Sequence, residues 1–76
     1  MNVTVEEIKN IIEEADTMAD MKNLQNDLPL SEQDIDSLDM ANILLLLEEK
    51  FEVKIPDEDM DKVQSIDAIV SYLSGK

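Results

Sequence analysis

The 76-residue sequence has no cysteine, no histidine, no tryptophan and no arginine, and it has one glycine and two prolines. Without cysteine the chain has no disulfide bond and no thiolate chemistry of its own. Without histidine it lacks the commonest general base and a frequent metal ligand. So few glycines and prolines allow few tight turns, which argues against a β-rich small domain. These absences disfavour an enzyme.

Charge of one sign dominates the chain, because 19 Asp and Glu oppose six lysines for a net charge of −13. Such a chain is repelled by nucleic-acid phosphates and by anionic membrane surfaces. Proteins with basic patches are its natural partners. The sequence shows no segment of membrane-spanning length and no secretory signal. We therefore expect residues 1–76 to form a single soluble domain, monomeric and cytoplasmic, that binds neither nucleic acid nor membrane.

The first predicted helix runs from about Thr4 to Ala15. Thr4 and Glu7 have the spacing of a capping box, in which each side chain accepts a hydrogen bond from a backbone N–H of the other residue. Apolar residues then recur at helical spacing, which predicts one buried stripe. The members of this stripe are Val5, Ile8, Ile11, Ile12 and Ala15.

Residues 16–36 show no clear period and are predicted to form a long connection that can include a short helical turn. A long loop in a small domain needs anchors, and its apolar residues can pack on the core. These residues are Met18, Met21, Leu24, Leu28 and Leu30.

The remaining sequence predicts one long helix over 38–51, a short helix over 57–62 and a last helix that starts after Ser65 and ends at Gly75. Asp36 or Ser37 can cap the long helix. The predicted fold is all-α: a small bundle of three main helices plus one short helix, with a long first loop.

The long helix carries two apolar stripes. One stripe suffices to face a core; it consists of Met40, Ile43, Leu44, Leu47 and Phe51. The second consists of Leu38, Ala41 and Leu45. Two readings remain open: a helix that is buried on both sides, or an exposed second stripe that receives a partner. The neighbouring Glu48 and Glu49 favour the second reading.

Ser37 stands at the predicted start of the long helix. It can be a simple cap, or it can carry a phosphate group, because free backbone N–H groups and the helix dipole stabilise an anion there. With no histidine or cysteine nearby in the sequence to activate it, Ser37 is a poor nucleophile by itself.

Three blocks of sequence resemble the acyl carrier proteins without a gap, and the resemblance covers essentially all 76 residues. The blocks are Asp36-Ser37-Leu38-Asp39, Leu47-Glu48-Glu49-Lys50-Phe51 and Ile55-Pro56-Asp57-Glu58-Asp59. The resemblance implies a non-catalytic carrier. A phosphopantetheinyl transferase would move 4′-phosphopantetheine from coenzyme A onto Ser37, and the thiol of that arm would carry acyl groups as thioesters among enzymes of fatty-acid, specialised lipid or polyketide-type biosynthesis.

The resemblance also implies where partners bind. The transferase and the acyl-transferring and chain-modifying enzymes would dock basic patches on the acidic, partly apolar face that begins at Ser37. By position this face comprises Asp36, Leu38, Asp39, Ala41, Leu45, Glu48, Glu49, Ile55 and Asp57. The bundle would shelter the acyl chain between its helices.

The chain departs from the family pattern at several positions. Gln33 and Asp34 stand where an apolar residue and then a glycine are usual, and Asn42, Lys50 and Lys54 replace common acidic residues. These departures favour a carrier dedicated to one pathway. The alternatives are an aminoacyl or peptidyl carrier and an unmodified acidic adaptor.

No metal site is expected. The acidic run from Asp57 to Asp61 imitates the start of a calcium loop, but its sixth position is Lys62 where a glycine is needed, and its twelfth is Ala68 where a glutamate is needed.

Overall fold

The structure is a computed structural model that describes residues 2–15 and 22–75. It contains three α-helices, α1 (Val5–Glu14), α2 (Ser37–Phe51) and α3 (Ile66–Ser74). Two 3₁₀ segments, η1 (Leu30–Glu32) and η2 (Asp57–Lys62), join them. Within the described ranges there is no strand, so the all-α prediction is confirmed. The predicted short helix is η2, and its tighter 3₁₀ form follows Pro56 directly.

The helix starts use the caps that the sequence predicts. The backbone N–H of Glu7 donates to the Thr4 hydroxyl at 3.2 Å, and the Glu7 carboxylate accepts from the Thr4 N–H at 3.2 Å, which completes the capping box of α1. The Ser65 hydroxyl accepts from the N–H of Ala68 at 3.1 Å and starts α3. Each cap satisfies a donor that the first helical turn leaves unpaired.

The described part of the long connection is fastened to the start of α3 by two backbone hydrogen bonds. The N–H of Leu30 donates to the carbonyl of Gln64 at 2.7 Å, and the N–H of Asp67 donates to the carbonyl of Asn26 at 3.0 Å. Leu24 and Leu30 are buried, as the anchoring prediction requires. Leu28 is only partly buried, and the other two predicted anchors, Met18 and Met21, lie outside the described residues.

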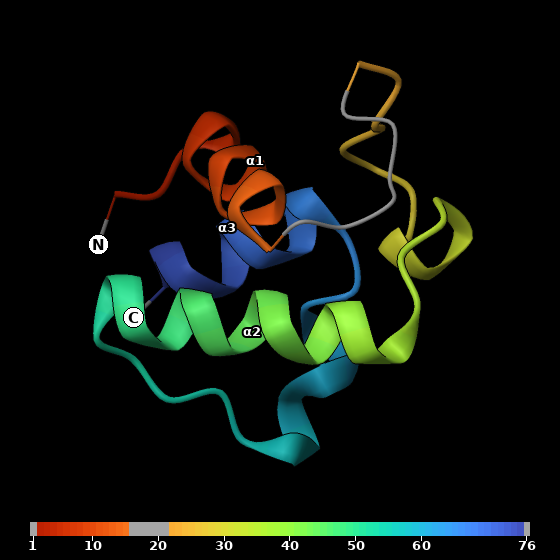
Figure 1. Cartoon of the computed structure of the whole chain (residues 1–76). Helices are drawn as coiled ribbons and strands as arrows, with labels where there is room; N and C mark the ends of the chain where they lie inside the picture. Colours follow the sequence, from red (N-terminus) through yellow and green to blue (C-terminus); the bar gives the residue numbers. More distant parts are fainter. Residues whose placement is uncertain (1, 16–21, 76) are drawn as a thin grey trace.

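The core lies between α1, α2 and α3. Helix α1 packs against both others, and α2 runs across the molecule as its longest element (Figure 1). Branched apolar side chains fill the centre, and several have no exposed surface; they include Ile8, Ile11, Ile12, Ile43, Leu47, Ile66, Ile69 and Leu73. Val3 and Ile35 are also buried, although the sequence pattern did not assign them to the core. Isolated residues in extended segments have no periodic signal.

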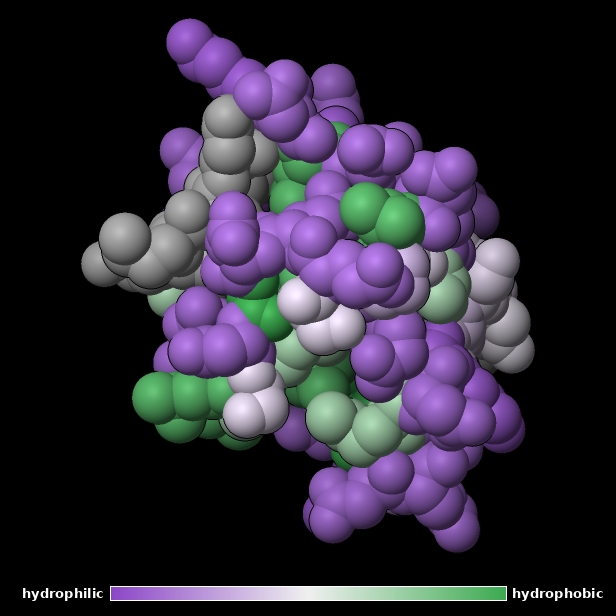
Figure 2. Space-filling model, turned by 90° about the vertical axis from the view of Figure 1, so that its right-hand side faces the viewer, coloured by the Kyte–Doolittle hydropathy of each residue, from purple (hydrophilic) through white to green (hydrophobic). Residues whose placement is uncertain are grey.

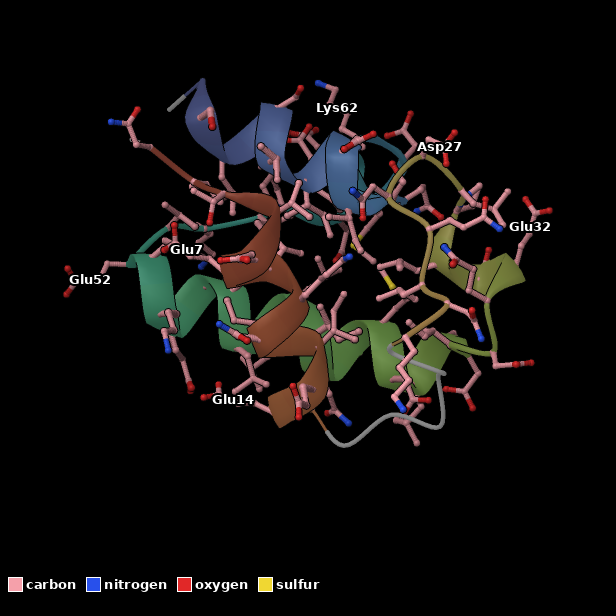
Figure 3. The ribbon with its side chains drawn as sticks, turned by 90° about the horizontal axis from the view of Figure 1, so that it is seen from above. Glu7, Glu14, Asp27, Glu32, Glu52 and Lys62 are labelled. Carbon is pink, nitrogen blue, oxygen red and sulfur yellow. The ribbon has the colours of Figure 1, made fainter. Side chains whose placement is uncertain are left out.

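Charged side chains surround this core at the edges of the bundle, where Figure 3 shows the labelled Glu52, Asp27 and Glu32 pointing away from the interior. Of the helices in residues 2–15 and 22–75, none has the length and apolar composition that crossing a membrane requires.

Candidate functional site

Ser37 is the first residue of α2 and is exposed. The residue before it, Asp36, is the N-cap: its backbone is extended, and its Oδ1 accepts from the N–H of Asp39 at 2.8 Å. The two caps that the sequence allowed are thereby distinguished. Because Asp36 serves as the cap, the Ser37 hydroxyl is not needed for this role, and it stands at the positive end of the helix dipole.

A surface cleft of about 490 Å³ lies beside this helix start. It is lined by Ser31, Asp34, Ile35 and Asp36. The face that carries the start of α2 is mostly polar, with apolar side chains in separate patches (Figure 2). Ser37 is therefore reachable from solvent, with open space next to it for a substituent on its hydroxyl.

The backbone conformation of the segment before Ser37 explains why aspartate can occupy position 34, where a glycine is usual. Its φ is 66°, a left-handed backbone conformation that glycine adopts without cost. Aspartate is among the few other residues that tolerate it. The turn that a glycine would make is thus retained, and it brings the buried Ile35 to the core immediately before the cap.

The two stripes of α2 differ in exposure as the partner-docking reading predicts. Four members of the first stripe are buried, namely Met40, Ile43, Leu44 and Leu47; Phe51 is partly buried against them. In the second stripe, Leu38 is 72% exposed and Leu45 is 55% exposed, with Ala41 exposed between them. The reading in which both sides of this helix are buried is wrong.

A groove of about 300 Å³ separates α2 from η2. Its lining includes four residues of the predicted docking face, Ala41, Leu45, Glu48 and Asp57, together with Met60 of η2. Ile55 also lines the groove but is only 8% exposed, so it presents little surface there and packs mainly in the core. It lies in the extended exit from α2, and such a segment brings alternate side chains inward.

The predicted docking carboxylates fall into two groups. Asp36, Glu49 and Asp57 are exposed and Asp39 is partly exposed. Glu48 is partly buried, and its Oε2 accepts from the backbone N–H of Ile55 at 2.9 Å. Glu48 therefore also holds the chain where it turns back from α2, a role that its position in a run of acidic residues did not reveal.

The acidic run that imitates a calcium loop forms the 3₁₀ segment η2. Asp59 in this segment accepts a 2.5 Å hydrogen bond from the hydroxyl of Tyr72 on α3, and its other oxygen lies 3.3 Å from Nζ of Lys62. The hydrogen bond to Asp59, with smaller contributions from burial and from the charges of Asp59 and Glu58, raises the pKa of Tyr72 to about 12. This contact has no signal in the sequence, because the two residues lie in different elements. Among the described residues, no three metal-ligating side chains come together.

The sequence matches the family model described as the phosphopantetheine attachment site over residues 6–73. It is 35% identical to the acyl carrier protein of Campylobacter fetus over 71 residues, which cover 92% of this chain and 91% of the relative. It is 32% identical to the acyl carrier protein of Buchnera aphidicola over 76 residues, which cover 100% and 96%. It is also 46% identical over 52 residues to "Acyl carrier protein 2, mitochondrial" of Arabidopsis thaliana, covering 68% of this chain and 37% of the relative.

Proposed function

The chain belongs to the acyl carrier proteins, and from this premise we propose that Ser37 is the residue to which its 4′-phosphopantetheine is attached. One observation carries the proposal: Ser37 is an exposed hydroxyl at the start of α2 that the neighbouring Asp36 frees from capping. The position lies within the matched residues 6–73. The cleft beside it leaves room for an extended substituent.

The chemistry of attachment is a phosphoryl transfer from coenzyme A. Oγ of Ser37 attacks the phosphorus that bears the pantetheine, a new O–P bond forms, and the pyrophosphate bond to the adenosine 3′,5′-bisphosphate leaving group breaks. The transferase supplies the base that takes the serine proton. The chain contributes an exposed nucleophile whose backbone is fixed by the Asp36 cap. Once attached, the arm supplies the thiol that this cysteine-free chain lacks.

Partner enzymes are proposed to bind the docking face, which we define as Asp36, Leu38, Asp39, Ala41, Leu45, Glu49 and Asp57. Exposed leucines on this face offer apolar contact, and the carboxylates attract basic residues. The charge supports this location, because residues 32–61 hold eleven acidic and two basic residues, a net of −9 out of −13. Glu48 and Ile55 are proposed to support the face from beneath, since both take part in the turn after α2.

The proposal assigns the protein to fatty-acid synthesis or to a related dedicated lipid pathway, acting as a cytoplasmic monomer. The unusual residues on and near the docking face favour a dedicated pathway. Asn42 and Lys54 are exposed, so they change the charge pattern that a partner meets. Nζ of Lys50 lies 4.0 Å from Oε1 of Glu14 in α1, so Lys50 forms an ion pair within the bundle and its charge is partly neutralised there.

The test is modification in vitro. Incubation with coenzyme A and a transferase of broad specificity should add the mass of one phosphopantetheinyl group, as measured by intact-protein mass spectrometry. The Ser37→Ala variant should add nothing and should keep the helical circular dichroism spectrum, because Asp36 remains as the cap. A Ser31→Ala variant, altered at the other hydroxyl near the cleft, is the matched control and should be modified normally.

Two results would contradict the proposal. A wild-type protein that gains no mass would support the rival function of an unmodified acidic adaptor. Continued modification of the Ser37→Ala variant would place the attachment site on another residue.

A further inference from the structure

The side chain of Gln33 binds the backbone of the preceding loop at three points. Its Oε1 accepts from the N–H of Gln25 at 2.6 Å. Its Nε2 donates to the carbonyl of Gln25 at 2.9 Å and to the carbonyl of Leu28 at 2.9 Å. Both donor hydrogens of the amide and one acceptor position are thus used. The amide joins two loop segments that lie eight and five residues earlier in the chain.

Gln33 is also fixed through its own backbone. Its N–H donates to the carbonyl of Leu30 at 2.9 Å and closes η1. Since Leu30 is buried and its N–H is bonded to the carbonyl of Gln64 before α3, this closure is continuous with the core. The Gln33 amide therefore fastens residues 25–28 to a part of the chain that the core already holds.

From Gln33 the chain reaches Ser37 in four residues, and each intervening residue has a defined role. Asp34 makes the left-handed turn, Ile35 is 1% exposed in the core, and Asp36 caps α2. Ile35 and Asp36 have ordinary anchors, namely apolar burial and a helix cap. An apolar side chain at position 33 could hold this segment by packing. Gln33 instead holds it with hydrogen bonds that are partly open to water.

We propose that Gln33 is a positioning residue for the modification of Ser37. Its amide holds the 25–28 loop beside Gln33 and Asp34, with which Gln25 and Leu28 line a second cleft. Asp34 also lines the cleft beside the serine, so the held loop helps that cleft to keep one shape when the transferase arrives. This inference rests on the proposed function, because it takes Ser37 to be the attachment residue. Gln33 does not touch the reacting atoms and acts only by keeping the approach to Ser37 ordered.

The expected kinetic effect follows from the population of the ordered loop. If the transferase must order the loop on binding, its apparent affinity for the carrier equals the intrinsic affinity multiplied by the fraction of carrier molecules whose loop is already ordered. Chemistry in the bound complex is unchanged, because the loop is ordered there in either case. Loss of the amide should therefore raise KM for the carrier and leave kcat unchanged.

The test compares three variants as substrates of one transferase at saturating coenzyme A. Gln33→Met keeps the side-chain length and removes all three hydrogen bonds, whereas Gln33→Glu keeps one acceptor and loses both donors. Gln25→Ala is the control, since the bonds to Gln33 use only the backbone of Gln25. We expect KM for the carrier to rise about fivefold to tenfold in both Gln33 variants, with kcat within about twofold of wild type, and no change in the control.

A second measurement reports on the bonds themselves. Amide hydrogen exchange at residue 25 should accelerate most in Gln33→Met, which removes the acceptor of this N–H. It should accelerate less in Gln33→Glu, which keeps an acceptor but loses both bonds from Nε2, and it should stay slow in Gln25→Ala. A merely structural role would lower the melting temperature without changing KM for the folded carrier.

The outcomes separate the two proposals. If wild type is modified and both Gln33 variants keep the wild-type KM, the positioning role is wrong and the proposed function stands. If both variants lose their helical circular dichroism at the assay temperature, the positioning role is also overturned, because the amide is then required for folding. If wild type itself is not modified at Ser37, the proposed function has failed, whatever the exchange data show.

Discussion

The carboxylate of Glu48 accepts a 2.9 Å hydrogen bond from the backbone N–H of Ile55, across the turn by which the chain leaves α2. The next residue along the helix, Glu49, is exposed. Two adjacent acidic residues that look equivalent in the sequence thus have different tasks. Glu48 stabilises the connection between α2 and η2, and Glu49 is available to a partner.

This difference predicts opposite phenotypes for two alanine variants. Glu48→Ala should lower the free energy of unfolding by about 1 to 2 kcal/mol, because a partly buried hydrogen bond to a charged group is lost and the Ile55 N–H is left without its partner. Glu49→Ala should change stability by less than about 0.5 kcal/mol, as surface substitutions usually do, and should weaken partner binding. Urea denaturation and binding measurements check both; equal stability losses would contradict the distinction.

The two stripes of α2 predict a second pair of variants. Leu45→Ser should cost less than about 1.5 kcal/mol, because Leu45 is 55% exposed, but should reduce acyl transfer by partner enzymes. Leu47→Ala should cost about 2–5 kcal/mol, because Leu47 has no exposed surface. Chemical denaturation and transfer assays compare the pair. A Leu45→Ser protein that unfolds as readily as Leu47→Ala would show that Leu45 packs in the core.

The left-handed backbone conformation of Asp34 predicts which residues this position tolerates. Asp34→Gly should be neutral or stabilising by up to about 1 kcal/mol, because relief of the positive φ is partly offset by the greater freedom of glycine in the unfolded chain. Asp34→Val should destabilise by more than about 1 kcal/mol, since a β-branched residue is an outlier at positive φ. Thermal melts of the two variants check this order, and the reverse order would contradict the assigned backbone conformation.

Tyr72 should link stability to pH at the alkaline end. Its pKa is raised to about 12 in the folded protein against 10.0 for the free side chain, mainly by the hydrogen bond to Asp59. The folded state therefore holds its phenolic proton more tightly than the unfolded state. The resulting stabilisation is complete below pH 10.0 and is lost as the pH rises toward about 12.

Ultraviolet titration checks this directly, because Tyr72 is the only tyrosine. In an Asp59→Ala variant the pKa of Tyr72 should fall toward the ordinary value, since both the hydrogen bond and the negative charge of Asp59 are removed. A Tyr72→Phe variant should show no alkaline change of stability from this group. An unchanged tyrosine titration in Asp59→Ala would rule out Asp59 as the main cause.

Helix positions were predictable because their signals are local. The Thr4–Glu7 capping box, the run from Ser37 to Phe51 without glycine or proline, and the cap at Ser65 each act within one or two helical turns. The exposed serine could also be located, because the start of a helix is defined by neighbouring residues. The buried Ile35 could not, because a single apolar residue between polar ones has no period to reveal it.

The sequence alone determined an all-helical chain, its strong negative charge and a serine at the start of the longest helix, since all of these depend on composition or on residues a few positions apart. The tertiary structure decided which side of α2 is covered, which of Glu48 and Glu49 is engaged, and how Gln33 and Asp34 form the approach to Ser37. Those outcomes depend on contacts between segments that meet only when the chain has folded. The same side chain can be a surface charge or a structural acceptor, according to which backbone group is brought within hydrogen-bonding distance.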